Sequence, residues 1–145
     1  DGLLCGKEEA HDAMAQGSML AGLAFSNTRT TACHSISYPL TMKYHIPHGV
    51  AVSMLLAPVM RLNQPYIKNR KELFNAFGVE SVSELSEKVT AILEKSGSPA
   101  KLSQWGAQES DFEELVAHSM TKGRADNNPA ELTAVNVEEI LRSVF

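Results

Sequence analysis

The chain has 145 residues, 21% of them charged, and a formal net charge of -4 at pH 7. This length suffices for one domain with a real hydrophobic core, so we treat 1–145 as a single domain. The balanced charge argues against a nucleic-acid-binding surface, and no apolar run reaches the roughly 20 residues that cross a bilayer. Two unclustered cysteines, Cys5 and Cys33, and the lack of a secretory signal favour the cytoplasm.

Helical periodicity without period-two alternation predicts an all-α bundle of about seven helices. The first three are expected at 8–26, 30–43 and 48–63. The third is apolar nearly all round, which predicts a central helix. Gly17 and Gly22 lower the helix propensity of the first, and they suit a face against which another helix packs closely.

The second helix can be capped by Thr30 or Thr31. Inside it, Pro39 removes the hydrogen bond that would run back to Ser35. Either this proline bends the helix, or the helix starts late or ends early there.

Four later helices carry boundary signals. A short amphipathic helix ends at Gly78, which suits a C-terminal cap. The segments 81–84 and 110–113 both have the Ser-x-x-Glu pattern of a capping box. Asn136 is the expected N-cap of the last helix, with acidic residues after it in the first turn.

Two histidines, His34 and His48, are the strongest candidates for chemistry, because neutral imidazole is a good ligand for divalent metals. A helix to about residue 41 carries the chain roughly 10 Å beyond His34. The next residues, extended at about 3.3 Å each, can return over that distance. Convergence is therefore possible but not required. The alternative is two ordinary polar residues, one on a helix face and one at a helix start.

Several segments together resemble a known family. These are Ala-Gly-Leu-Ala-Phe-Ser-Asn at 21–27, His34, Pro-His-Gly at 47–49, Asp-Asn-Asn-Pro at 126–129 and Val-Glu-Glu-Ile-Leu at 137–141. In this order they resemble the C-terminal helical half of the iron-containing (group III) alcohol dehydrogenases. The separation of the two histidines is similar to that between the third and fourth metal ligands of the family.

The resemblance implies a metal-binding half-domain in which His34 and His48 are two of four ligands. The family's other two ligands and its nucleotide-binding domain lie upstream of anything present here, and the first residue is not Met, so we expect a chain trimmed from a longer one. A family histidine of the proton path falls on Tyr38, which becomes a candidate catalytic residue. His45 is a possible substitute for that lost histidine.

The implied activity is reversible hydride transfer between NAD(P)H and an aldehyde, with Fe(II) the expected metal and zinc possible. The expected partners are a small aldehyde or alcohol, the missing domain and a second copy in a homodimer. The chain alone is predicted to be inactive. Two alternatives stay open: a zinc enzyme of the glycerol dehydrogenase or dehydroquinate synthase type, and a stand-alone helical assembly module without catalysis.

Arg29 and Thr31 are candidates for substrate binding. A guanidinium and hydroxyl groups at a helix start suit an oxyanion. The run from Ser26 to Thr41 is also similar to family members that reduce phosphonoacetaldehyde. The alternative is a capping threonine beside a surface arginine.

Overall fold

The computed structural model describes residues 6–120 and 122–145, and within them the chain is helical, with no strand. It divides into two compact units, residues 1–30 and 31–145. Seven α-helices and four short 3-10 segments are present in the described part, which confirms the predicted all-α class. None of these helices combines the length and the hydropathy that a bilayer crossing requires.

The first unit contains one helix, α1 (Glu8–Ser26). Glu8 and Glu9 occupy its first turn, where negative charge interacts favourably with the helix dipole. No residue of α1 is buried, and a Cβ added at Gly17 or Gly22 would have no atom within 4 Å. The predicted helix is therefore confirmed, and the packing expected against the two glycines stays a prediction.

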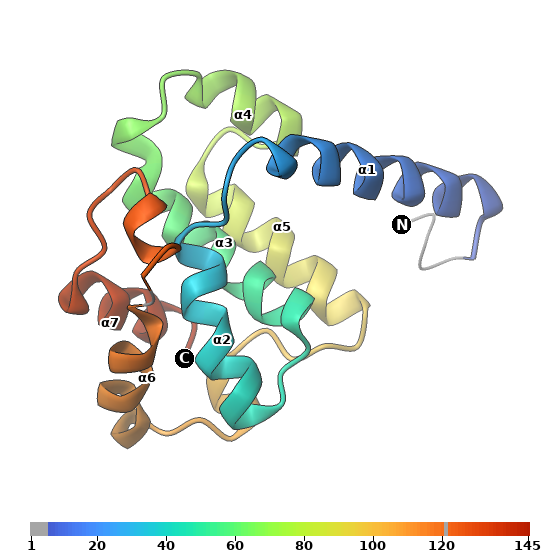
Figure 1. Cartoon of the computed structure of the whole chain (residues 1–145). Coiled ribbons are helices and arrows are strands. Elements are labelled where there is room, and N and C mark those ends of the chain that lie inside the picture. Colours follow the sequence, from blue (N-terminus) through green and yellow to red (C-terminus); the bar gives the residue numbers. More distant parts are fainter. Residues whose placement is uncertain (1–5, 121) are drawn as a thin grey trace. The chain divides into compact units, whose positions relative to one another are not determined.

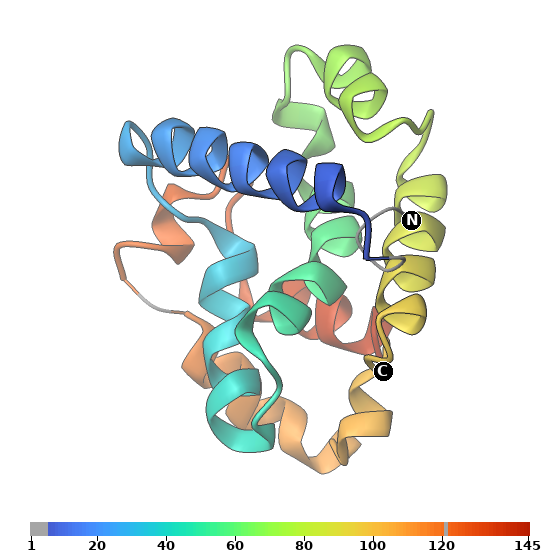
Figure 2. The ribbon, with the colours of Figure 1, turned by 90° about the vertical axis from the view of Figure 1, so that its right-hand side faces the viewer.

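The second unit is built around α3 (His48–Asn63), which packs against α2 (Ala32–Tyr44), α5 (Val82–Lys95) and α7 (Ala134–Ser143) (Figures 1 and 2). Fully buried Leu55 of α3 belongs to the main hydrophobic core, together with Ile36 and Leu40 of α2. The prediction that this apolar helix is central is therefore confirmed.

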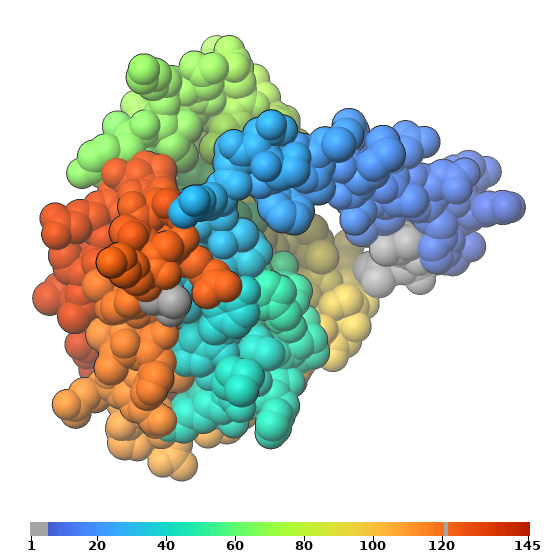
Figure 3. All heavy atoms as spheres, viewed as in Figure 1, coloured from blue at the N-terminus to red at the C-terminus, as the bar shows by residue number. Residues whose placement is uncertain are grey.

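Helix α6 (Phe112–Ser119) packs on the other side of α2 and also contacts α7. Figure 3 shows the atoms of α2, in cyan, against those of α6, in orange, on one face of this unit. The short helix α4 (Arg70–Phe77) ends at Gly78, which has a φ of 64° and donates its backbone N–H to Asn75. This left-handed C-cap is the one that the sequence predicted.

Four 3-10 segments complete this unit: η1 (Gln64–Tyr66), η2 (Leu102–Trp105), η3 (Glu109–Asp111) and η4 (Ala125–Asn127). The segment after η4 is attached to α3 by a buried amide pair. Asn63 and Asn128 each donate to the other's side-chain oxygen, at 2.8 and 2.7 Å. Asn128 also donates to the carbonyl of Ala130, and the backbone N–H of Ala130 donates to Asn63. This pair fixes the η4 segment against the C-terminal end of α3.

Two predicted helix starts are wrong. Ser110 does not cap a helix, because it lies inside η3, where Gln108 precedes the turn and donates its backbone N–H to Asp111. Helix α6 starts after this turn. In α7 the N-cap is Thr133, whose Oγ1 accepts from the backbone of Asn136, while the Asn136 side chain accepts from Thr133. Asn136 is therefore the third helical residue and not the cap.

The capping box predicted at 81–84 is half correct. Ser81 accepts from the backbone N–H of Glu84, but the Glu84 carboxylate accepts from the backbone of Glu80. Helix α2 has Thr31 at its N-cap without a side-chain cap bond, and it continues through Pro39. The alternative in which Pro39 marks an early end or a late start is therefore wrong.

Candidate functional site

His34 and His48 lie side by side at the starts of two neighbouring helices. His34 is in the first turn of α2, and His48 is the first residue of α3. Between the helices, His45 caps the end of α2 in a left-handed conformation with a φ of 56°, Ile46 is fully buried, and Pro47 is the N-cap of α3. This reversal brings the two imidazole rings to a centroid separation of 5.3 Å, with planes tilted by 58°.

The side chain of Ser37 connects the two histidines. It is fully buried, and its Oγ donates to the carbonyl oxygen of His34 at 3.0 Å. The same Oγ lies 3.5 Å from Nδ1 of His48. Sequence reasoning missed Ser37, although its position one turn after His34 placed it on the same side of α2.

Tyr38 stacks on His48, with ring centroids 5.6 Å apart and an angle of 28° between the planes. Tyr38 also contacts Arg124, whose Cζ is 4.6 Å from the centroid of the tyrosine ring. Arg124 comes just before η4 and was also missed by sequence reasoning. The available signal was its place two residues before the family-like segment at 126–129.

The surroundings of His34 favour its neutral form. Burial lowers the pKa of His34 below 6.5, and the positive charges of His48 and Arg124 lower it further. A neutral ring keeps a nitrogen lone pair for a metal ion, whereas a protonated ring has none. His34 therefore remains a competent ligand at neutral pH.

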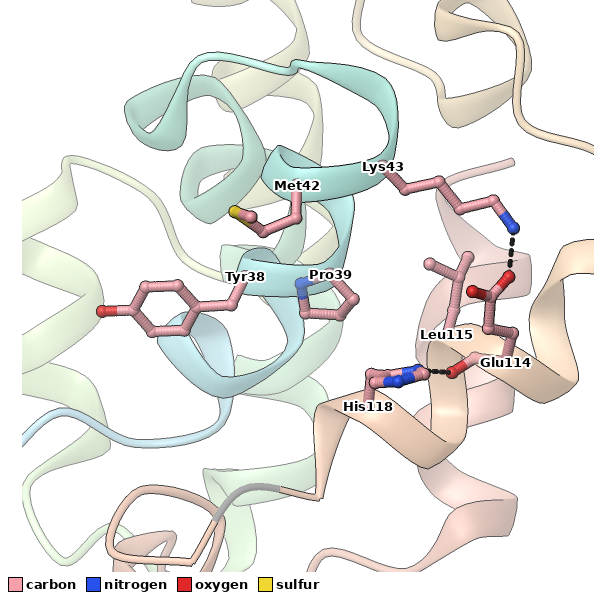
Figure 4. A pocket seen from close by; sticks show the side chains of 7 residues that line it. All are labelled: Tyr38, Pro39, Met42, Lys43, Glu114, Leu115 and His118. Carbon is pink, nitrogen blue, oxygen red and sulfur yellow. Dashed lines mark hydrogen bonds and ion pairs between the residues drawn. The ribbon is translucent and has the colours of Figure 1, made fainter.

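A groove of about 470 Å³ lies between α2 and α6 and shares Tyr38 with this cluster. Figure 4 shows its lining: the Tyr38 ring and the Met42 side chain lie along α2, with His118 and Leu115 on the facing helix α6. At one end, Lys43 forms ion pairs with Glu114 and Asp111. The groove is thus largely apolar, and its lysine is already neutralised.

The other candidate residues differ in exposure and in their contacts. Arg29 is exposed and outside any helix, in the first unit. Thr31 is half-buried at the α2 N-cap. His45 is exposed. The Cys33 Sγ faces the carbonyl of Leu55, and burial raises the pKa of its thiol to about 12. Cys5 is outside the described residues.

Among residues 6–120 and 122–145, no group of three or more His, Cys, Asp or Glu side chains could hold a metal ion. His34 and His48 therefore form a two-donor arrangement in the described part of the chain. This is the donor number that the family resemblance assigned to this half of the enzyme, and the ligand role of each histidine stays a prediction.

Comparisons with known proteins agree on one family. Residues 5–145 match the Fe-containing alcohol dehydrogenase family, C-terminal. Long-chain-alcohol dehydrogenase 1 of Geobacillus thermodenitrificans is 31% identical over 148 residues, which cover 95% of this chain and 38% of that protein. Lactaldehyde reductase of Escherichia coli is 28% identical, over 99% of this chain and 40% of its own length. The chain thus spans about two fifths of these relatives.

Solved structures give the same result. The sulfoacetaldehyde reductase of Bifidobacterium kashiwanohense, solved in complex with NAD⁺, superposes with a TM-score of 0.82 at 29% identity, over 94% of this chain and 36% of that one. A 1,3-propanediol oxidoreductase superposes with a TM-score of 0.80, also at 29% identity, over 94% of this chain and 38% of its own. The chain belongs to the Fe-containing alcohol dehydrogenase family and corresponds to its C-terminal helical part.

Proposed function

We propose that this chain supplies the metal-binding half of an NAD(P)-linked alcohol dehydrogenase that interconverts an aldehyde and an alcohol. The observation that carries the proposal is the pairing of His34 and His48, with ring centroids 5.3 Å apart. Membership of the family supports the reaction class. The relatives that the chain matches include alcohol dehydrogenases and aldehyde reductases.

The separation of the two rings suits a shared metal ion. Two imidazoles bound through nitrogen at about 2.1 Å to one tetrahedral metal would have their ring centroids roughly 5 Å apart. The observed distance agrees with that value without any movement of the helices. Imidazole donors suit Fe(II) and zinc alike, so the family supplies the preference for iron. The remaining ligands would come from residues upstream of these two.

The chemistry divides between the bound groups and the chain. When bound, the metal supplies a Lewis acid for the carbonyl oxygen, and the nicotinamide supplies the hydride. His34 and His48 hold the metal in this half of the enzyme. The Tyr38 ring stacks on His48, and this contact supports Tyr38 as a residue that contacts the substrate. The isolated chain is expected to have no dehydrogenase activity.

The substrate proposed here is a short aldehyde, and an anionic one is supported by two observations. The segment 26–41 is similar to phosphonoacetaldehyde-reducing members of the family. A sulfoacetaldehyde reductase superposes on the chain with a TM-score of 0.82. In both aldehydes an acidic group is attached one carbon from the carbonyl.

The test is metal content in the full-length protein, measured by mass spectrometry after reconstitution with anaerobic Fe²⁺ or with Zn²⁺. We expect His34→Ala and His48→Ala to lose most of the metal and the reduction of propionaldehyde. His118→Ala is the matched control, because His118 lies on α6, where its Nδ1 is 2.8 Å from the carbonyl oxygen of Glu114. Full metal content in both site variants would overturn the proposed ligands. The metal that restores activity distinguishes the iron enzyme from the zinc alternative.

A further inference from the structure

Arg124 is a half-buried cation, and it has no acidic partner among the residues that the structure describes. Its guanidinium lies over the Tyr38 ring at 4.6 Å. Within residues 6–120 and 122–145 no carboxylate forms an ion pair with it. The acidic residue closest in sequence, Asp126, instead accepts from the backbone N–H of Gly123. A guanidinium is a strong hydrogen-bond donor to anions. A half-buried guanidinium without an anionic side chain beside it is therefore a candidate site for an anionic ligand.

The position of Arg124 is fixed by the turn around it. The backbone N–H of Gly123 donates to Asp126, and the Asn127 side chain donates to the carbonyl of Gly123. The turn is followed at once by Asn128, which forms the buried amide pair with Asn63 of α3. The arginine is therefore carried by a segment anchored to the helix that begins with His48.

Arg124 also belongs to the surroundings of the histidine pair. Tyr38 is a ring contact of both Arg124 and His48. The positive charge of Arg124 contributes to the lowered pKa of His34. Among the described residues, the immediate surroundings of this site therefore contain a cation and two imidazoles and no paired carboxylate.

We propose that Arg124 binds the anionic group of a short aldehyde whose carbonyl lies at the His34 and His48 pair. The inference rests on the proposed function and names its substrate class: an aldehyde that carries a carboxylate, sulfonate or phosphonate. From carbonyl oxygen to acidic oxygen, a two-carbon aldehyde with a sulfonate or phosphonate extends about 5 Å over four bonds of about 1.5 Å, and glyoxylate extends about 3.5 Å over three. Such a molecule is long enough to place its ends near two neighbouring side chains.

The contacts of Arg124 support this role, whereas Arg29 is exposed and lies outside any helix. Arg124 is half-buried and touches a ring that itself touches His48. The planar guanidinium binds a carboxylate or phosphonate through two parallel hydrogen bonds, which also orients the bound molecule. The same arginine would bind all three acidic groups, so the experiment must compare them.

The experiment measures kcat/KM of the full-length, metal-loaded protein for glyoxylate, sulfoacetaldehyde and phosphonoacetaldehyde, each relative to propionaldehyde. In Arg124→Gln we expect the anionic-to-neutral ratio to fall about 10- to 100-fold, the usual effect of losing a hydrogen bond between charged groups. Arg124→Lys keeps the positive charge but lacks the planar guanidinium, so its anionic-to-neutral ratio should lie between those of the wild type and Arg124→Gln. The acid with the largest drop identifies the substrate chemistry.

Arg61→Gln is the matched control, because Arg61 is an exposed arginine in the last turn of α3, about 20 Å along the helix from His48. Its ratio should not change. Arg29→Gln is measured in the same series. A ratio unchanged by Arg124→Gln, or one lowered only by Arg29→Gln, overturns the role of Arg124. If the wild-type protein reduces none of the four aldehydes with metal, the proposed function itself fails, and the inference fails with it.

Discussion

The Oγ atom of Ser37 lies 3.5 Å from Nδ1 of His48 and donates its proton to the carbonyl oxygen of His34. Because this hydroxyl has only one proton, its oxygen can meet Nδ1 of His48 only as an acceptor. The arrangement therefore favours a proton on Nδ1 and leaves the lone pair on Nε2. Side chains that orient a metal-binding histidine in this way are a common part of metal sites.

We predict that Ser37→Ala changes the tautomer of His48. In the 145-residue chain labelled with ¹⁵N-histidine, NMR at pH 8 should show Nδ1–H for His48 in the wild type. The variant should move toward Nε2–H, and in the full-length protein its metal affinity should fall about 10- to 100-fold. Ser35→Ala is the control, because Ser35 is equally buried in α2 but bonds to Ser119. Observation of Nε2–H in the wild-type chain would contradict this assignment.

The amide pair of Asn63 and Asn128 should contribute strongly to stability. Asn128→Ala leaves the buried polar groups of Asn63 without their partners, and each such group costs about 1–3 kcal/mol. We expect the free energy of unfolding in urea to fall by about 2–4 kcal/mol. The exposed Asn75→Ala should change it by less than about 0.5 kcal/mol. Equal effects of the two substitutions would show that the pair contributes little.

The lowered pKa of Asp111 predicts a loss of stability in acid. The Lys43 ammonium, the backbone N–H of Gln108 and the Tyr44 hydroxyl all donate to this carboxylate, and together they lower its pKa from 3.8 to about 2. Between these two values the unfolded chain binds a proton that the folded chain does not. The stabilisation is therefore present above pH 4 and is lost as the pH falls toward 2.

The measurement compares urea midpoints of the wild type and Asp111→Asn at pH 5 and pH 3. The wild type should lose more stability over this interval than the variant, because asparagine has no proton to bind. Added salt should reduce the difference, since the carboxylate and its lysine are at the surface. The same pH dependence in both proteins would exclude Asp111 as a source of it.

The sequence predicted helices well where a local signal set their ends. The range 48–63 was correct because Pro47 cannot continue a preceding helix and the apolar pattern after it is unbroken. Gly78 ended α4 as predicted because only glycine adopts its left-handed conformation at little cost. The starts at Ser110 and Asn136 were misplaced, because several polar residues nearby could cap and only packing selects one of them.

At the site, the sequence indicated the two histidines but not the residues that contact them or their neighbours. Proline and glycine around His48 made a reversal toward His34 possible, and the structure places the two rings together. Arg124 reaches Tyr38 from the other end of the chain, through the turn before Asn128. Such a contact depends on how α3 and the last third of the chain pack, and no periodic pattern in the sequence records that.

The bond between Asn63 and Asn128 has a consequence for how this protein could acquire new substrates. It ties the turn that carries Arg124 to α3, the helix that begins with His48. If Arg124 binds the substrate as proposed, a single codon change at 124 can alter the charge beside the substrate while the amide pair stays intact. Exchange of the whole turn would also remove the Asn63–Asn128 hydrogen bonds and destabilise the fold. Substitution of residue 124 alone therefore changes the local charge at the lower cost in stability.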